Sequence, residues 1–133
     1  MRLAVDANIW ISSLLKQTFQ YRTEVFFGSE NIVLVSTELF HDLEDAIQKP
    51  YLAKRVNREL YEKLVARLKT DAELVDVHSV VEVCRDPKDN FLLALAKDGN
   101  ADYLITGDDD LLVLETFKKT KIVTLTDFET VVS

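Results

Sequence analysis

Aspartates recur in this sequence next to short apolar runs. Asp6 directly follows the run "RLAV", and a row of three aspartates, 108–110, comes just after the run "DYLIT". Asp42 and Asp89 lie in two further segments of the chain. Carboxylates brought close together repel one another unless a cation or solvent offsets their charge. Mg²⁺ prefers carboxylate oxygens as ligands, and carboxylate-bound cations assist phosphodiester hydrolysis, so the aspartates suggest a metal site for that chemistry.

The elements that would position these acids alternate between strands and helices. We predict strands over 2–7, 31–35, 73–77, 102–106 and 121–125. We predict helices over 36–47, 54–72, 86–99 and 109–117, and a last helix that a capping box of Thr126 and Glu129 opens. Such alternation indicates an α/β domain with a mainly parallel sheet. Sites in these sheets lie beyond the carboxyl ends of the strands, so acids from four segments should converge at one edge.

Most of these acids also have a structural interpretation. Asp86 before Pro87 fits the N-cap of a helix, and an acid at position 89 favours the helix dipole whatever the function. The aspartates at 108–110 could cap a short helix. Asp6 is harder to explain in this way, because an acid that ends a buried strand needs partners. The joint pattern therefore carries more weight than any single residue.

Composition limits the classes of protein to consider. The 133 residues suit one domain over 1–133, and the net charge of −7 argues against non-specific binding of nucleic acid unless part of the acid binds metal. Cys84 is the one cysteine, which excludes an intrachain disulfide and fits a reducing compartment. No stretch approaches the ~20 apolar residues of a membrane helix. We expect a soluble, cytoplasmic protein that does not bind membranes.

Three segments together resemble the PIN domain family: "AVDANIWISSLL", "VSTELFHDLEDAI" and "CRDPKDNFLLALAKDGNADYLITGDDDLLVL". The resemblance covers residues 2 to about 132 and is closest to the branch of toxin components of bacterial toxin–antitoxin systems. It implies a Rossmann-like three-layer α/β/α fold with a central five-stranded parallel sheet. It also implies an Mg²⁺- or Mn²⁺-dependent endoribonuclease that hydrolyses RNA phosphodiester bonds.

Carried over residue by residue, the resemblance assigns four catalytic acids, of which Asp42 stands where the family usually has a glutamate. Asp42 reaches less far than glutamate, and Glu44 cannot replace it, because two residues along a helix turn the side chain by about 200°. The catalytic acids implied are Asp6, Asp42, Asp89 and Asp108; the metal ligands are Asp6, Asp89, Asp108 and the auxiliary Asp110; and the polar residues bordering the site are Asn8, Ser36 and Thr106.

The resemblance also implies partners. RNA is the expected substrate, an antitoxin protein is the expected inhibitor, and family members often form a homodimer. The apolar stripe of the predicted helix 54–72 suits either a dimer or ordinary core packing. Cations near the rim are unranked candidates for RNA contacts: Lys49, Lys54, Arg55, Arg85 and Lys88.

Competing classes fit less well. A phosphatase of the haloacid dehalogenase type needs D-x-D after the first strand, where this chain has Asp6-Ala7-Asn8. The sequence has no G-x-S-x-G, C-x-x-C or H-E-x-x-H motif and no glycine-rich phosphate loop. The departure at Asp42 keeps one alternative open, a catalytically weakened PIN-like interaction module that acts through a protein partner.

Overall fold

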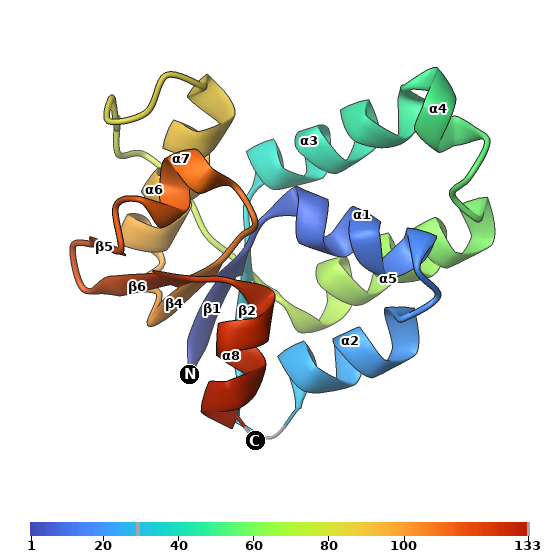
Figure 1. Cartoon of the computed structure of the whole chain (residues 1–133), viewed down its shortest axis with the longest axis horizontal. Coiled ribbons are helices and arrows are strands. Elements are labelled where there is room, and N and C mark those ends of the chain that lie inside the picture. Colours follow the sequence, from blue (N-terminus) through green and yellow to red (C-terminus); the bar gives the residue numbers. More distant parts are fainter. Residues whose placement is uncertain (29, 133) are drawn as a thin grey trace.

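A computed structural model, which describes residues 1–28 and 30–132, has a six-stranded sheet at its centre (Figure 1). The strands are β1 (Arg2–Val5), β2 (Ile32–Val35), β3 (Glu73–Leu74), β4 (Tyr103–Ile105), β5 (Thr116–Phe117) and β6 (Thr120–Val123). Their order in the sheet is β3-β2-β1-β4-β6-β5. The predicted five parallel strands are confirmed, and the short β5 adds an antiparallel edge to β6.

Helices cover both faces of this sheet, which gives the three-layer α/β/α arrangement (Figure 1). One face carries α1 (Ala7–Leu15), α2 (Phe19–Phe27), α3 (Thr37–Gln48), α5 (Arg58–Asp71) and α8 (Leu125–Val132). The other face carries α6 (Pro87–Asp98) and the short α7 (Asp109–Leu112). The single turn α4 (Pro50–Ala53) extends α3 away from the sheet.

Alternating strand residues divide the core between the two faces. Leu3 and Val5 of β1 belong to the cluster packed under α1, α3 and α5, whereas Ala4 between them belongs to the cluster under α6. This alternation is the two-residue period of a strand that is buried on both faces. The apolar stripe of α5 packs in the first cluster through Tyr61, Leu64 and Leu68, so core packing accounts for it.

Two polar side chains hold the extended segment 75–86 against α6. The Asp98 carboxylate accepts hydrogen bonds from the backbone N–H groups of His78 and Ser79 and from the Ser79 hydroxyl. Burial alone would raise the pKa of Asp98, but these three bonds hold it at about 2. Asn90 accepts from the N–H groups of Val83 and Cys84. The chain thereby reaches the start of α6 in a fixed position.

Several predicted elements differ from the structure. The predicted strand 2–7 ends at Val5, and α1 and α2 were not predicted. The predicted helix 54–72 begins only at Arg58, because the Asn57 side chain accepts the Leu60 N–H and caps it there.

Two differences lie near the C-terminus. The predicted helix 109–117 stops at Leu112, since Glu115 adopts a φ of 61° and the chain turns back into the hairpin of β5 and β6. The predicted capping box is wrong, because α8 begins at Leu125 and the Thr124 hydroxyl accepts the Asp127 N–H. Glu129 pairs instead with Arg22 of α2.

Among the described residues, no helix is both long enough and apolar enough to cross a membrane.

Candidate functional site

The carboxyl ends of β1 and β4 lie side by side and open into a cavity of about 210 Å³. The sheet order reverses between these two strands: β2 continues on one side of β1, and β4 lies on the other. This is the position at which open α/β sheets hold their ligands. The acids that line the cavity come from four segments of the chain: Asp6, Asp42, Asp86, Asp89 and Asp108. All four predicted catalytic acids are therefore brought together.

Asp6 is held in place from both sides. Its Oδ1 accepts the Asn8 N–H at 3.1 Å, which also caps α1, and its Oδ2 accepts the Thr106 hydroxyl at 2.7 Å. Burial raises the pKa of Asp6, while these two hydrogen bonds lower it. The Thr106 oxygen in turn accepts the Asp108 N–H at 3.1 Å. The fully buried Thr106 thus connects two of the acids and fixes their separation.

Asp89 is the most deeply buried of these acids, with 6% of its surface exposed. It lies in the first turn of α6, which Asp86 caps by accepting the Lys88 N–H, as the sequence predicted. Burial and the neighbouring carboxylate of Asp108 raise the pKa of Asp89 to about 7. Its Oδ2 has no hydrogen-bond partner among the described residues. A buried carboxylate oxygen without a donor is costly unless a cation binds it.

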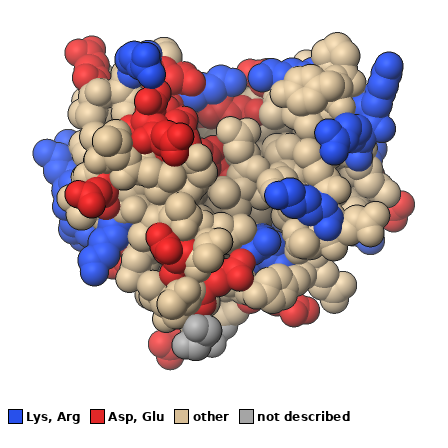
Figure 2. All heavy atoms as spheres, viewed as in Figure 1, with Lys and Arg blue, Asp and Glu red and all other residues tan. Residues whose placement is uncertain are grey.

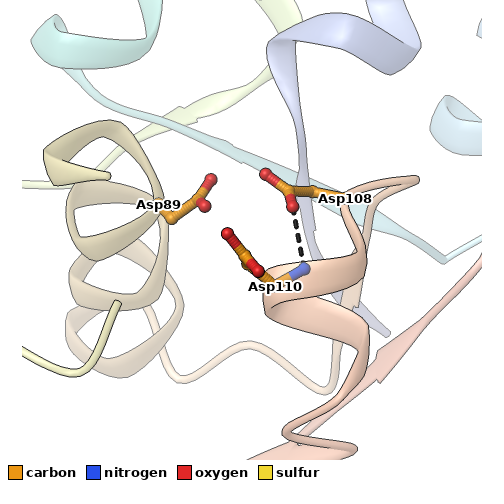
Figure 3. A group of neighbouring side chains, drawn as sticks. All are labelled: Asp89, Asp108 and Asp110. Atoms are coloured by element: carbon orange, nitrogen blue, oxygen red, sulfur yellow. Dashed lines mark hydrogen bonds between the residues drawn. The ribbon is translucent and has the colours of Figure 1, made fainter. Parts of the chain in front are cut away.

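Asp108 and Asp110 stand opposite Asp89 at the start of α7 (Figure 3). One carboxylate oxygen from each of the three residues lies within 4.8 Å of the others. Asp108 also caps α7 by accepting the Asp110 N–H at 2.9 Å, so its structural and its proposed ligand roles are compatible. Asp110 is partly balanced by Arg85 at 3.1 Å. The oxygen donors and the unpaired Asp89 Oδ2 suit a hard divalent cation, so the residues present fit such an ion.

Asp42 faces the cavity from α3. Leu39, Asp42, Ala46 and Lys49 all line it, and their spacing of three, four and three residues defines one face of a helix. Burial raises the pKa of Asp42, and Lys88 across the cavity lowers it. Glu44 turns toward α5 instead, where it accepts the Tyr61 hydroxyl at 2.8 Å. Glu44 thus points away from the cavity, as the helix geometry predicted when it excluded Glu44 as a replacement for Asp42.

Two of the three polar residues expected to border the site lie at it, and the third, Ser36, does not. Asn8 lines the cavity, and Thr106 binds two of its acids. Ser36 lies outside the cavity lining, and its hydroxyl accepts the Leu39 N–H and caps α3. Ser36 therefore affects the site through the start of α3. Of the five candidate cations, Lys49 and Lys88 line the cavity, which the sequence did not rank.

The fold and the site together define an α/β domain with a mostly parallel sheet and a cluster of aspartates at the carboxyl edge of its strands. A family model described as PIN domain matches residues 2–110, and the chain therefore belongs to the PIN domain family, whose members are generally nucleases. Comparison with curated proteins and with solved structures gave no match.

Proposed function

We propose that this protein is a metal-dependent endoribonuclease that hydrolyses RNA phosphodiester bonds. The observation that carries the proposal is the buried Asp89, whose Oδ2 has no partner among the described residues and which lines the cavity together with Asp6, Asp42 and Asp108. One carboxylate oxygen of Asp89 also lies within 4.8 Å of one from Asp108 and one from Asp110. Membership of the PIN domain family supports the same activity. The proposed ligands of Mg²⁺ or Mn²⁺ are Asp6, Asp89, Asp108 and Asp110, with Asp42 as a further catalytic acid.

Hydrolysis forms a bond from a water oxygen to phosphorus and breaks the bond from phosphorus to a ribose oxygen, which takes up a proton. When bound, a divalent ion supplies positive charge at the phosphate and polarises the water. The chain itself fixes where this happens. Thr106 keeps Asp6 and Asp108 at a set separation, and the first turn of α6 places Asp89 opposite them.

The proposal is tested by cleavage of a panel of labelled structured RNAs with Mn²⁺, with Mg²⁺ and with chelator. Wild type, Asp6→Asn and the control Asp109→Asn are purified in parallel; Asp109 is exposed and does not line the cavity. We expect metal-dependent cleavage by wild type and by Asp109→Asn, and none by Asp6→Asn. Equal cleavage by all three proteins would indicate a contaminating ribonuclease or a wrong site.

We further propose that the protein is the toxin of a toxin–antitoxin pair and acts in the cytoplasm, either alone or as a homodimer. The sequence resemblance described above supports this role. Induced expression in a bacterial host should then arrest growth with wild type and not with Asp6→Asn. Normal growth with a folded, RNA-cleaving wild type would contradict the toxin role and leave the nuclease proposal intact.

A second candidate function is a catalytically weakened module that acts through a protein partner. The short Asp42 side chain favours it, because the fourth acid then reaches less far into the cavity than a glutamate would. This candidate predicts a folded wild type that cleaves no RNA with either metal and that matches Asp6→Asn in every cleavage assay.

A further inference from the structure

The corner formed by the end of α3 and by α4 carries cations and an exposed aromatic ring beside the acidic cavity. We propose that this corner, defined as residues 49–55, binds single-stranded RNA. A base would stack on Tyr51, and phosphates would lie at Lys49, Lys54 and Arg55. The inference rests on the proposed function, because it names the form of RNA that the nuclease site receives.

Charge is distributed unevenly around the cavity. The wall formed by α6 and α7 has four acids against the single lining cation Lys88, whereas the wall formed by α3 has the single acid Asp42 and ends at Lys49; the four acids are Asp86, Asp89, Asp108 and Asp110. Figure 2 shows acidic side chains gathered at the upper left, over α7, and basic side chains at the upper right, over α4, with the surface hollowed between them. A phosphate chain is repelled by the first wall and attracted by the second, so the second wall is the one that can hold the strand.

The cations of the corner are available for a ligand. Lys49, Lys54 and Arg55 are exposed, and none of them forms an ion pair with a residue that the structure describes. Two other cations are already paired: Arg85 with Asp110, and Arg58 with Glu44 and Glu62. Arg85 is thereby a weaker candidate for RNA contact than Lys49. Lys88 forms no ion pair with a described residue, but it stands among the acids on the opposite side of the cavity.

Tyr51 lies exposed on a turn that is anchored in the core. The residue is 62% exposed, while the next residue, Leu52, is buried in the core. Pro50 at the first position of α4 fixes the backbone before Tyr51. Exposed aromatic rings between cations are the features with which proteins bind unpaired strands, because a base can stack on the ring only when it is free of its partner.

The corner is continuous with the cavity. Lys49 belongs to both, since it lines the cavity and also precedes α4. Lys49 directly follows α3 and lies seven residues beyond Asp42, or about 10 Å along the helix axis. An RNA strand that binds at Tyr51 therefore passes Lys49 before it reaches the aspartates of the cavity.

The test measures RNA binding by fluorescence anisotropy in chelator, where the strand stays intact. The probes are a short, unstructured, labelled RNA and the same strand annealed to its complement. The variants are Tyr51→Ala, Tyr51→Phe and Lys49→Gln. The controls are Tyr21→Ala, which changes another exposed tyrosine on α2, and Lys97→Gln, which changes an exposed lysine at the far end of α6.

We expect tighter binding of the single strand than of the duplex. Tyr51→Ala should weaken single-strand binding at least about fivefold, while Tyr51→Phe keeps the ring and binds as wild type does. Lys49→Gln should reduce the slope of log affinity against log salt by about 0.7, the effect of one lost phosphate contact. Both controls should bind as wild type does.

Two results would overturn the inference: a wild type that binds no single-stranded RNA, or Tyr51→Ala and Lys49→Gln variants that bind as the controls do. Neither result depends on cleavage, which the Asp6→Asn comparison measures separately. Binding that depends on Tyr51 in a protein that cleaves no RNA would support the corner as an RNA site and refute the nuclease proposal.

Discussion

Replacement of Asp89 by asparagine should stabilise the protein at pH 8 when no metal is bound. In the unfolded chain the carboxyl group has a pKa of 3.8, whereas burial and the nearby Asp108 raise it to about 7 in the folded protein. Between these pH values the folded protein binds more protons than the unfolded chain, so its free energy of unfolding falls as the pH rises. The full difference corresponds to at most about 4 kcal/mol at pH 8.

Asparagine removes the cost of burying an ionised carboxylate, but its amide group carries a cost of its own. An amide at the position of Asp89 leaves a buried polar group without a partner, which costs about 1–3 kcal/mol. We therefore expect Asp89→Asn to gain roughly 1–3 kcal/mol over wild type at pH 8. Near pH 4 wild-type Asp89 is protonated, so only the cost of the amide remains and the variant should be about 1–3 kcal/mol less stable than wild type.

Urea unfolding in chelator between pH 4 and pH 8 measures the free energies of unfolding of wild type and of Asp89→Asn. The control is Asp109→Asn, which removes an exposed acid from the same run and should change stability by only about 0.5 kcal/mol. Added Mn²⁺ should stabilise wild type and leave Asp89→Asn unchanged, because only wild type retains the buried carboxylate. A variant less stable than wild type at pH 8, or a wild type whose stability does not fall between pH 4 and pH 8, would refute this account of Asp89.

Three further predictions follow from the hydrogen bonds and the helix faces. Thr106→Val should lower Mn²⁺ affinity about 10- to 100-fold by calorimetry, while Thr106→Ser should retain it, because only serine keeps the hydroxyl that donates to Asp6. Asp98→Ala should cost about 2 kcal/mol at pH 7 in urea unfolding, because the folded pKa of about 2 lies below the unfolded 3.8. That cost should shrink as the pH falls from 4 toward 2, and a cost independent of pH would contradict the hydrogen bonds assigned to Asp98. Asp42→Glu should raise Mn²⁺ affinity and RNA cleavage together, since the longer side chain on the same helix face reaches farther into the cavity; a fall in both would show that the cavity is shaped for aspartate.

The placement of the acids could be predicted from the sequence because it depends on a simple rule. Asp6 and Asp108 follow two strands whose carboxyl ends must share one edge if both are parallel. Asp86 and Pro87 marked the start of α6 and so fixed the position of Asp89 within its first turn. The ends of the strands and the start of the helix are marked by residues that are close together in the sequence, so predicting them did not require knowledge of tertiary contacts.

Other features could not be predicted, because they depend on tertiary contacts. The segment of α1 mixes Ile9 and Ile11 with polar residues, a pattern that fits a strand as well as a helix, and only packing of Trp10 and Leu14 into the core settles it. The chain enters β5 through a left-handed residue, Glu115, and turns from β5 into β6 at another, Lys118, at positions where glycine would have been the usual signal.

The choice among the candidate cations also had to come from the structure. The sequence gives no reason to prefer Lys49 over Arg85 as an RNA contact. In the structure Arg85 forms an ion pair with Asp110, whereas Lys49 forms no ion pair with a described acid. The Asn57 cap was readable in principle, since asparagine is a favoured N-cap residue, but Val56 lies four residues before Leu60 and so extended the predicted apolar stripe past the start of α5.

The hydrogen bond from Thr106 to Asp6 joins residues 100 positions apart in the chain. Contacts between such distant residues require closure of a long loop, and they form only when the sheet between them has been built. The arrangement of Asp6 and Asp108 in the cavity therefore depends on the pairing of β1 with β4. We therefore expect the proposed metal site to form only when β1 and β4 have paired, so that the recovery of metal binding during refolding reports this pairing of the central strands.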